Sequence, residues 1–405
     1  MRDVSDWFYL NEVRDRELVG ILTWRFKGST SLHNHRLEFT EDGIVRIILI
    51  YNPKGNLDRV LSSLSDKEFK VLQTEIEEKL LGPQVYQVVR DIIFSKIPVM
   101  GWWGSKHLTI YEAEATFPKP QFNGQGFHIE TYAKPFVLEV PFKLVNHQLT
   151  NIVRAQESIK EIHLVLKLFT KLLLPYKNNL IVQHWATLVE SLEEGSSRTV
   201  WVQEGYSAPE FERFAPFMRP NLGLIEIPSI PSDIYFQNKS LVENQIFSIP
   251  DSLELLLSSF DTLNSADHKR LMRAAYWFNH AEAVLPLSRS AALISLVQAV
   301  ESLIVHGSSE KCETCGRAYG DGVGKSFRKF LERFVSKSDD YSEALKTLYK
   351  TRSNLTHGDH VLLADEYLLP TNSPGYSQEW ILVNMAQEVT QTAIMGWLVD
   401  RRLRD

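Results

Sequence analysis

The sequence predicts an α+β protein in which a β-rich N-terminal domain is followed by an all-α helical bundle. Several stretches of the first two hundred residues alternate between apolar and polar side chains, as half-buried strands do. Six prolines fall between residues 206 and 250, where few helical patterns occur. After residue 250, apolar residues recur at helical spacing. We therefore expect domains at residues 1–205 and 251–405, joined by a Pro-rich connector at residues 206–250.

The composition excludes several classes of protein. Hydrophobic residues make up 44% of the chain and charged residues 23%, the balance of a globular protein without extensive disorder. The formal net charge of −6 argues against a globally basic nucleic-acid binder but leaves room for a local basic site. No apolar stretch reaches the roughly 18–20 residues that span a bilayer, so we expect no membrane partner. Only two cysteines are present, which indicates a reducing, cytoplasmic location.

The N-terminal strands are predicted from two patterns. Residues 136–144 follow a period of two with one apolar face, and Pro141 places this strand at a sheet edge or a bulge. Residues 43–51 form a continuous β-branched run that is typical of a buried strand. Further strands are expected at residues 19–26, 106–117, 126–132 and 199–203. Amphipathic patterns predict two helices among them, at residues 66–81 and 152–173.

The C-terminal domain is predicted to be helical throughout. The first helix, at residues 265–284, has Ser265 as its expected N-cap. A polar, glycine-rich loop at residues 307–324 separates the second helix from the third. The later helices are expected at residues 288–305, 325–335, 341–357 and 377–404.

Arg352 and His357 form the pair of residues best suited to chemistry. In metal-independent RNA cleavage the 2′-hydroxyl loses a proton as it attacks phosphorus, and the leaving 5′-oxygen gains one. Histidine can serve either step because its ordinary pKa lies near neutral pH. Arginine stays charged and can hold the phosphorane oxygens with two hydrogen bonds. Positions i and i+5 lie about 140° apart on an ideal helix, so the pair needs a tightened last turn or a partner surface.

The segment Leu348-Tyr-Lys-Thr-Arg352-Ser-Asn-Leu-Thr-His357-Gly358 resembles the signature of Apea-like HEPN domains over about residues 250–405. The resemblance implies a helical bundle that forms a homodimer and cleaves RNA in a composite cleft. Arg352 and His357 would then be catalytic, and Ser353 or Asn354 would be the polar helper. Glu301, on an upstream helix as in the family, is expected to orient Arg352 by an ion pair, because an unpaired carboxylate on an apolar face is costly.

The resemblance further implies an endoribonuclease without a catalytic metal, which leaves a 2′,3′-cyclic phosphate and a 5′-hydroxyl. The RNA, transfer RNA among others, would be cut during anti-phage defence or abortive infection in response to an unidentified phage-derived trigger. In that arrangement the N-terminal domain would sense the trigger or gate the activity of the helical domain. The alternative is a catalytically inactive HEPN module that dimerises or binds a partner.

Basic residues are in excess near the Arg–His pair. Lys346, Lys350, Arg328 and Lys329 belong to a stretch with twice as many basic as acidic residues. They are interpreted either as contacts to the RNA backbone or as a solvated helix face, and the sequence does not separate the two.

Cys312-Glu-Thr-Cys315 is the one feature that the resemblance leaves unexplained. Two cysteines at this spacing are half of a structural zinc site, which needs four ligands. His306 could add a third ligand, or two chains could share one four-cysteine site. The alternatives are free structural thiols or a redox pair.

Overall fold

The computed structural model describes residues 1–10, 13–26, 30–33, 35–53, 55–81, 85–95, 99–113, 134–170, 184–189, 199–204, 212–216, 225–237, 247–305, 310–311, 318–319, 323–335, 339–357, 361–366 and 374–402. Helices and antiparallel sheets are both present there, which confirms the α+β class. Within these ranges, none of the helices combines the length and the apolar character that crossing a membrane requires.

The chain divides into two compact units, each assembled from separated segments. The first comprises Met1–Arg90, Glu139–Ile159 and Glu212–Arg219, and the second comprises Asp91–Leu138, Lys160–Phe211 and Pro220–Asp405. The division runs through three elements, β6 (Val85–Ser95), β9 (Lys134–Leu144) and α4 (Gln148–Phe169). It does not follow the limits at residues 205 and 250, so those domain boundaries remain a prediction.

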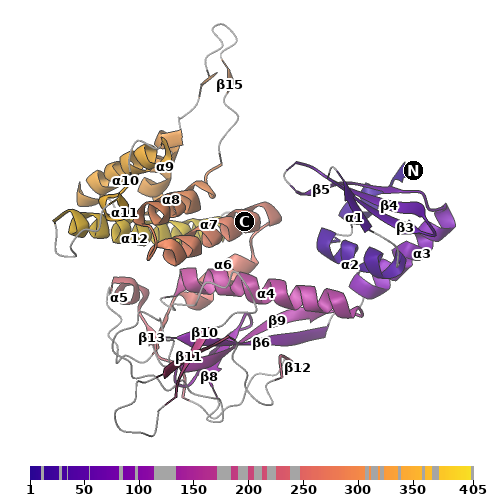
Figure 1. The fold of residues 1–405 in the computed structure, drawn as a ribbon, viewed down its shortest axis with the longest axis horizontal. Helices are drawn as coiled ribbons and strands as arrows, with labels where there is room; N and C mark the ends of the chain where they lie inside the picture. Colours follow the sequence, from indigo (N-terminus) through magenta and orange to yellow (C-terminus); the bar gives the residue numbers. More distant parts are fainter. Residues whose placement is uncertain are drawn as a thin grey trace. The chain divides into compact units, whose positions relative to one another are not determined.

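The first unit contains a five-stranded antiparallel sheet in the order β1-β5-β4-β3-β2, accompanied by helices α1, α2 and α3 (Figure 1). The strands are β1 (Arg2–Asp3), β2 (Thr30–His33), β3 (Arg36–Glu41), β4 (Ile44–Tyr51) and β5 (Leu57–Ser62). The helices are α1 (Ser5–Leu10), α2 (Asp15–Phe26) and α3 (Asp66–Ile76), which continues as a π-helical turn, η1 (Glu77–Leu81).

The core of this unit corrects one prediction and confirms two. Residues 19–26 form the end of α2 and not a strand, because its buried side chains Leu18, Ile21 and Leu22 follow helical spacing. They belong to one core with Ile47 and Leu49 of β4, the strand expected at residues 43–51. The helix expected at residues 66–81 is also present, as α3 and η1.

A second sheet has the order β12-β6-β9-β8-β7, with β7 (Trp102–Gly104), β8 (Thr109–Glu112) and β12 (Phe214–Pro216) completing it. The strand that contains Pro141 therefore lies inside the sheet between β6 and β8, so the edge position is wrong, and the alternative of a bulge stays a prediction. The strand expected at residues 199–203 is present as β11 (Thr199–Glu204), paired with β10 (His184–Val189). The strand expected at residues 126–132 lies outside the described residues.

The Pro-rich segment is held by short backbone pairings. Trp102 donates its N–H to the carbonyl of Ile225 at 2.9 Å, and Ile227 donates to the carbonyl of Trp102 at 2.8 Å. Farther along the chain, β13 (Ser229–Ile230) pairs in parallel with β14 (Ile249–Pro250), and one short helix, α5 (Ser232–Gln237), lies between them. Where it is described, the segment is thus mainly extended chain, as its prolines predicted.

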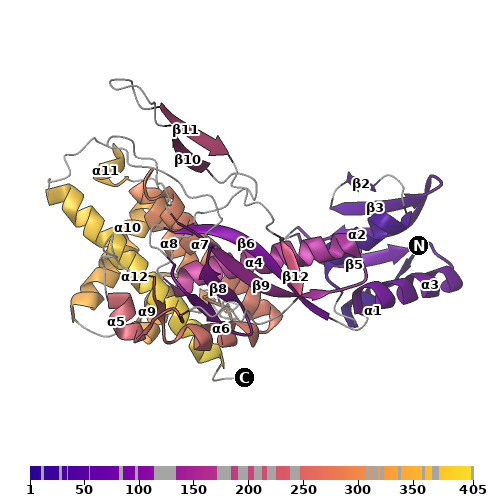
Figure 2. The ribbon, with the colours of Figure 1, turned by 90° about the horizontal axis from the view of Figure 1, so that it is seen from below.

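The described residues from 251 onward are mainly helical, and α7, α8 and α12 lie side by side (Figures 1 and 2). The helices are α6 (Leu253–Asp261), α7 (Ser265–Val284), α8 (Arg289–Glu301), α9 (Val323–Phe334), α10 (Asp339–His357), α11 (Leu363–Glu366) and α12 (Pro374–Arg402), and two short strands, β15 (Glu310–Lys311) and β16 (Ala318–Tyr319), pair between α8 and α9. The N-cap of α7 is Asn264 and not Ser265, since the Asn264 side chain accepts from the N–H groups of Ala266 and Asp267.

Candidate functional site

Arg352 of α10 is held by an ion pair to Glu301, the last residue of α8. The Nη2 atom of Arg352 lies 3.0 Å from Oε1 and 3.3 Å from Oε2 of Glu301. Their side chains are 17% and 13% exposed, so the pair is largely removed from water. Gln298 donates to Oε2 of the same carboxylate at 3.3 Å. The contact expected between Arg352 and Glu301 is therefore present.

Helical spacing explains why Arg352 is largely covered and His357 is exposed. Leu348, Arg352 and Leu355 follow one another at intervals of four and three, so they share the face of α10 that packs inward. His357 is five positions beyond Arg352, on a different face, and its side chain is exposed. Ser353 and Asn354, the expected polar helpers, are half-buried between them. One copy of α10 thus presents a fixed cation and a solvent-accessible imidazole on separate faces.

The basic residues predicted to contact RNA lie on α9 and α10. Arg328, Lys329 and Lys350 are exposed, whereas Phe327 and Leu331 of α9 are buried. Lys346 belongs to α10, but its side chain lies outside the described residues. The exposed cations therefore lie on surfaces of the two helices that water can reach, in the same unit as Arg352.

In a second Arg–His pair, Arg273 and His280, only the histidine is held by contacts within the helical unit. Both residues lie on α7, but the ring of His280 contacts the hydroxyl of Ser295 at 3.0 Å and stacks on Tyr276. Arg273 points to solvent. The pair provides a natural comparison for the one on α10.

Residues that the sequence did not single out hold the segment that follows His357 in the chain. Asp365 accepts hydrogen bonds of 2.8 Å from the hydroxyl of Ser288 and from the backbone N–H groups of Arg289 and Ser290, at the start of α8. Burial alone would raise the pKa of Asp365, but these hydrogen bonds outweigh it and lower the pKa. A carboxylate at a helix N-terminus is also favoured by the helix dipole.

Arg289 is the residue in the sequence that could have pointed to the contacts at the start of α8. A cation in the first turn of a helix is unfavourable, so its position calls for compensation elsewhere. The guanidinium carbon of Arg289 lies 3.7 Å from the centroid of the Tyr376 ring, and Nη1 donates to the carbonyl of Tyr376 at 3.1 Å. Glu379 of α12, whose carboxylate approaches Arg289 to 4.0 Å, accepts from the backbone N–H of Leu363.

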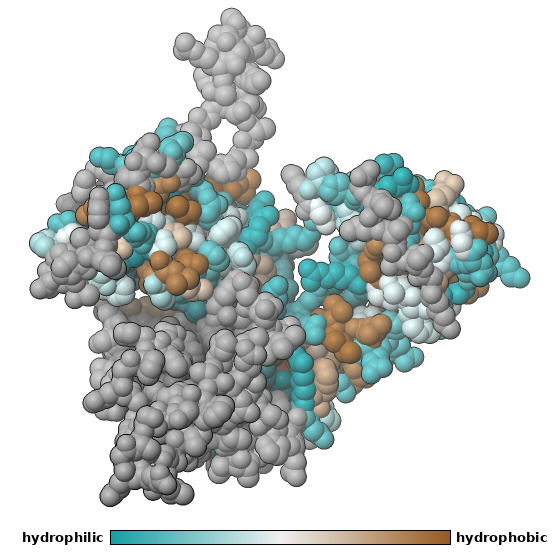
Figure 3. All heavy atoms as spheres, in the orientation of Figure 1, coloured by the Kyte–Doolittle hydropathy of each residue, from teal (hydrophilic) through white to brown (hydrophobic). Residues whose placement is uncertain are grey.

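The surface near these contacts is partly apolar. The side chains of Leu363, Trp380 and Ile381 are exposed although they are large and hydrophobic. Figure 3 shows apolar residues among the polar ones over the helices of this unit.

The described residues do not extend to the proposed zinc ligands. Cys312, Cys315 and His306 lie outside them, so the zinc hypothesis stays a prediction. Among the residues that are described, no group of three or more His, Cys, Asp or Glu side chains could hold a metal ion. Neither a family model, nor a curated protein, nor a solved structure matches this chain.

Proposed function

We propose that this protein is a metal-independent endoribonuclease that uses Arg352 and His357. The observation that carries the proposal is the ion pair between Arg352 and Glu301 at 3.0 Å, which fixes a guanidinium on the same helix as an exposed histidine. A fixed cation suits a phosphorane, because its orientation is set before charge develops in the transition state. The abortive-infection setting and the phage-derived trigger rest on the resemblance to HEPN proteins alone.

In the proposed reaction, the 2′-oxygen of a ribose forms a bond to the adjacent phosphorus, and the bond from phosphorus to the 5′-oxygen breaks. Arg352 neutralises the non-bridging oxygens. His357 transfers one of the two protons, either from the attacking 2′-hydroxyl or to the leaving 5′-oxygen, and water accepts or supplies the other. The products are a 2′,3′-cyclic phosphate and a 5′-hydroxyl.

A second copy of the chain completes the proposed cleft. Arg352 and His357 project about 140° apart from one helix, so a single α10 is poorly arranged to place both on one phosphate. Two copies can bring the arginine of one protomer and the histidine of the other to the same site. The exposed apolar residues Leu363, Trp380 and Ile381 supply surface that such a contact could bury.

The test is a cleavage assay with transfer RNA and with unstructured RNA, in excess EDTA. We expect cleavage by the wild-type chain and a loss of at least about 100-fold in His357→Ala, the usual contribution of a general acid or base. His357 is exposed, so this variant should fold normally. Arg352→Lys keeps the charge but loses the planar donor pair, and we expect a comparable loss. Arg273→Ala, which removes an exposed cation from α7, is the matched control and should cleave normally.

Two further measurements distinguish the proposed mechanism from cleavage by a contaminating nuclease. A substrate with 2′-O-methyl groups should resist cleavage, and the normal products should carry cyclic phosphate ends. Wild-type rates in His357→Ala would overturn the proposal. If the wild-type chain binds RNA or dimerises without cleaving, the inactive binding module becomes the better interpretation.

A further inference from the structure

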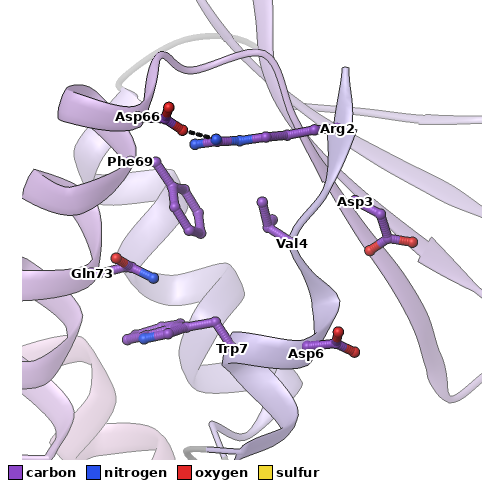
Figure 4. A pocket seen from close by; sticks show the side chains of 8 residues that line it. All are labelled: Arg2, Asp3, Val4, Asp6, Trp7, Asp66, Phe69 and Gln73. Carbon is purple, nitrogen blue, oxygen red and sulfur yellow. Dashed lines mark hydrogen bonds and ion pairs between the residues drawn. The ribbon is translucent and has the colours of Figure 1, made fainter.

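The first unit contains a pocket that the proposed ribonuclease does not use. It has a volume of about 290 Å³ and lies between the N-terminal strand, α1 and the start of α3 (Figure 4). Its walls are formed by Arg2, Asp3, Val4, Asp6, Trp7, Asp66, Phe69 and Gln73. In Figure 4, Arg2 and Asp66 close one side and Trp7 the opposite side, with Phe69 and Gln73 between them.

The charge of the pocket favours a cation. Three carboxylates and one guanidinium line the pocket, a formal sum of −2, and Asp66 is the carboxylate that meets the guanidinium of Arg2 (Figure 4). Hydrogen bonds from the side chain and backbone of Ser5 lower the pKa of Asp3, so this group is ionised at neutral pH. Asp66 lies in the first turn of α3, where the helix dipole favours its charged form.

The aromatic residues add a second preference for the same kind of ligand. The rings of Trp7 and Phe69 meet edge to face, with centroids 6.5 Å apart, and both line the pocket. The faces of aromatic rings attract cations, and guanidinium groups also stack on them. Val4 contributes apolar surface for an alkyl chain.

The pocket already holds one guanidinium, which comes from the chain itself. The guanidinium carbon of Arg2 lies 5.3 Å from the centroid of the Phe69 ring, and the group forms an ion pair with Asp66. The side chains of Arg2 and Asp66 are 42% and 88% exposed. An ion pair in that environment contributes about 0–1 kcal/mol, so a competing cation can displace it.

We propose that this pocket binds the side chain of an arginine from a partner polypeptide, and that Arg2 is a built-in competitor for the site. An arginine side chain satisfies all three features, since its guanidinium matches the carboxylates, its plane stacks on an aromatic ring and its methylenes fit the apolar wall. The pocket and the Arg352 site belong to different units, so RNA cleavage and arginine binding can be tested separately.

The experiment follows the ¹⁹F NMR signal of fluorotryptophan at Trp7 in the full chain, assigned with Trp7→Phe. The probes are a Gly-Gly-Arg-Gly-Gly peptide, the same peptide with citrulline, which is neutral, and propylguanidinium. We expect the arginine peptide to shift the signal and the citrulline peptide to bind at least about fivefold more weakly, the loss of one charge-based contact. Binding of propylguanidinium without binding of the arginine peptide would exclude a polypeptide ligand and overturn the proposal.

The proposal predicts the direction in which each substitution changes the affinity for the arginine peptide. Arg2→Gln should tighten binding of the arginine peptide by about threefold or more, because it removes the resident cation. Gln73→Glu adds a carboxylate of the same size and should also tighten binding, whereas Asp6→Asn should weaken it. Asp58→Asn removes an exposed carboxylate outside the pocket and should change nothing. Weaker binding in Arg2→Gln would mean that Arg2 itself holds a ligand, and would overturn the proposal.

Discussion

At the scale of single residues, Arg352 illustrates how a charge is kept in a half-buried position. Its guanidinium is 17% exposed and faces the carboxylate of Glu301 at 3.0 Å. Removing a charge from water costs several kcal/mol, and an opposite charge at this distance returns much of that energy. Removing either residue alone leaves the other charge in a largely covered position without its counter-ion. The effects of substituting the two residues on stability should therefore depend on each other.

This coupling predicts a specific pattern of stabilities. Glu301→Ala should lower the free energy of unfolding by about 3 kcal/mol, the lower end of the range for broken buried pairs, because Arg352 then lacks its carboxylate. Arg352→Met should cost less, and adding it to Glu301→Ala should recover at least about 1 kcal/mol. The free energies of unfolding of the wild type, the two single variants and the double variant are measured by urea denaturation. Hydrogen exchange of the α10 amides gives a second measurement for the same four proteins. Additive effects of the two substitutions would show that the ion pair does not stabilise the unit.

At the scale of helices and strands, periodicity predicted most of the elements, and local competition explains the errors. Residues 265–284, 325–335 and 341–357 are helical as expected, because their apolar residues recur at helical spacing. Residues 19–26 are a short stretch with five apolar residues, so a strand and a buried helix fit the sequence equally well. In the folded unit, Leu18, Ile21 and Leu22 of α2 share one buried core with Phe39 and Val60 of the sheet, and this packing requires the helix.

The candidate site shows the same limit. The contact between Arg352 and Glu301 could be anticipated, since an apolar face with a carboxylate needs a cation. The contacts of Asp365 with the start of α8 join segments more than seventy residues apart, and no local pattern encodes them. They become visible only when the helices are packed.

Gly101 provides a test at this scale, where β7 meets the Pro-rich segment. It has a φ of +85°, and a Cβ atom there would lie 2.0 Å from the carbonyl oxygen of Ile225. Gly101→Ala should destabilise the second unit by more than about 3 kcal/mol, since backbone strain and a backbone clash add. Gly43→Ala, at φ +76° with open space around its Cβ, isolates the strain and should cost about 1 kcal/mol. Equal effects in the two variants, measured by thermal unfolding, would show that Ile225 does not pack against Gly101.

At the scale of the whole molecule, the net charge of −6 limits how the protein could bind RNA in the proposed reaction. A globally acidic surface repels phosphate, so binding has to depend on a local group of cations. The residues proposed for this role, Arg328, Lys329 and Lys350, are exposed on α9 and α10 in the unit that holds Arg352. An acidic protein with a basic site should bind RNA weakly except where that site is engaged.

The salt dependence of RNA binding tests whether the cations on α9 and α10, and not the net charge of the chain, govern the proposed binding. The affinity of the His357→Ala chain for single-stranded RNA should fall with rising salt, by about 0.7 in the logarithmic slope for each phosphate contacted. Alanine at Arg328, Lys329 and Lys350 together should therefore reduce the slope by about 2. The control replaces Lys160, Lys269 and Arg273, three exposed cations of the same unit, and makes the same change in net charge. If both triple variants reduce the slope equally, overall charge governs binding; a loss confined to the first variant places the RNA backbone along α9 and α10.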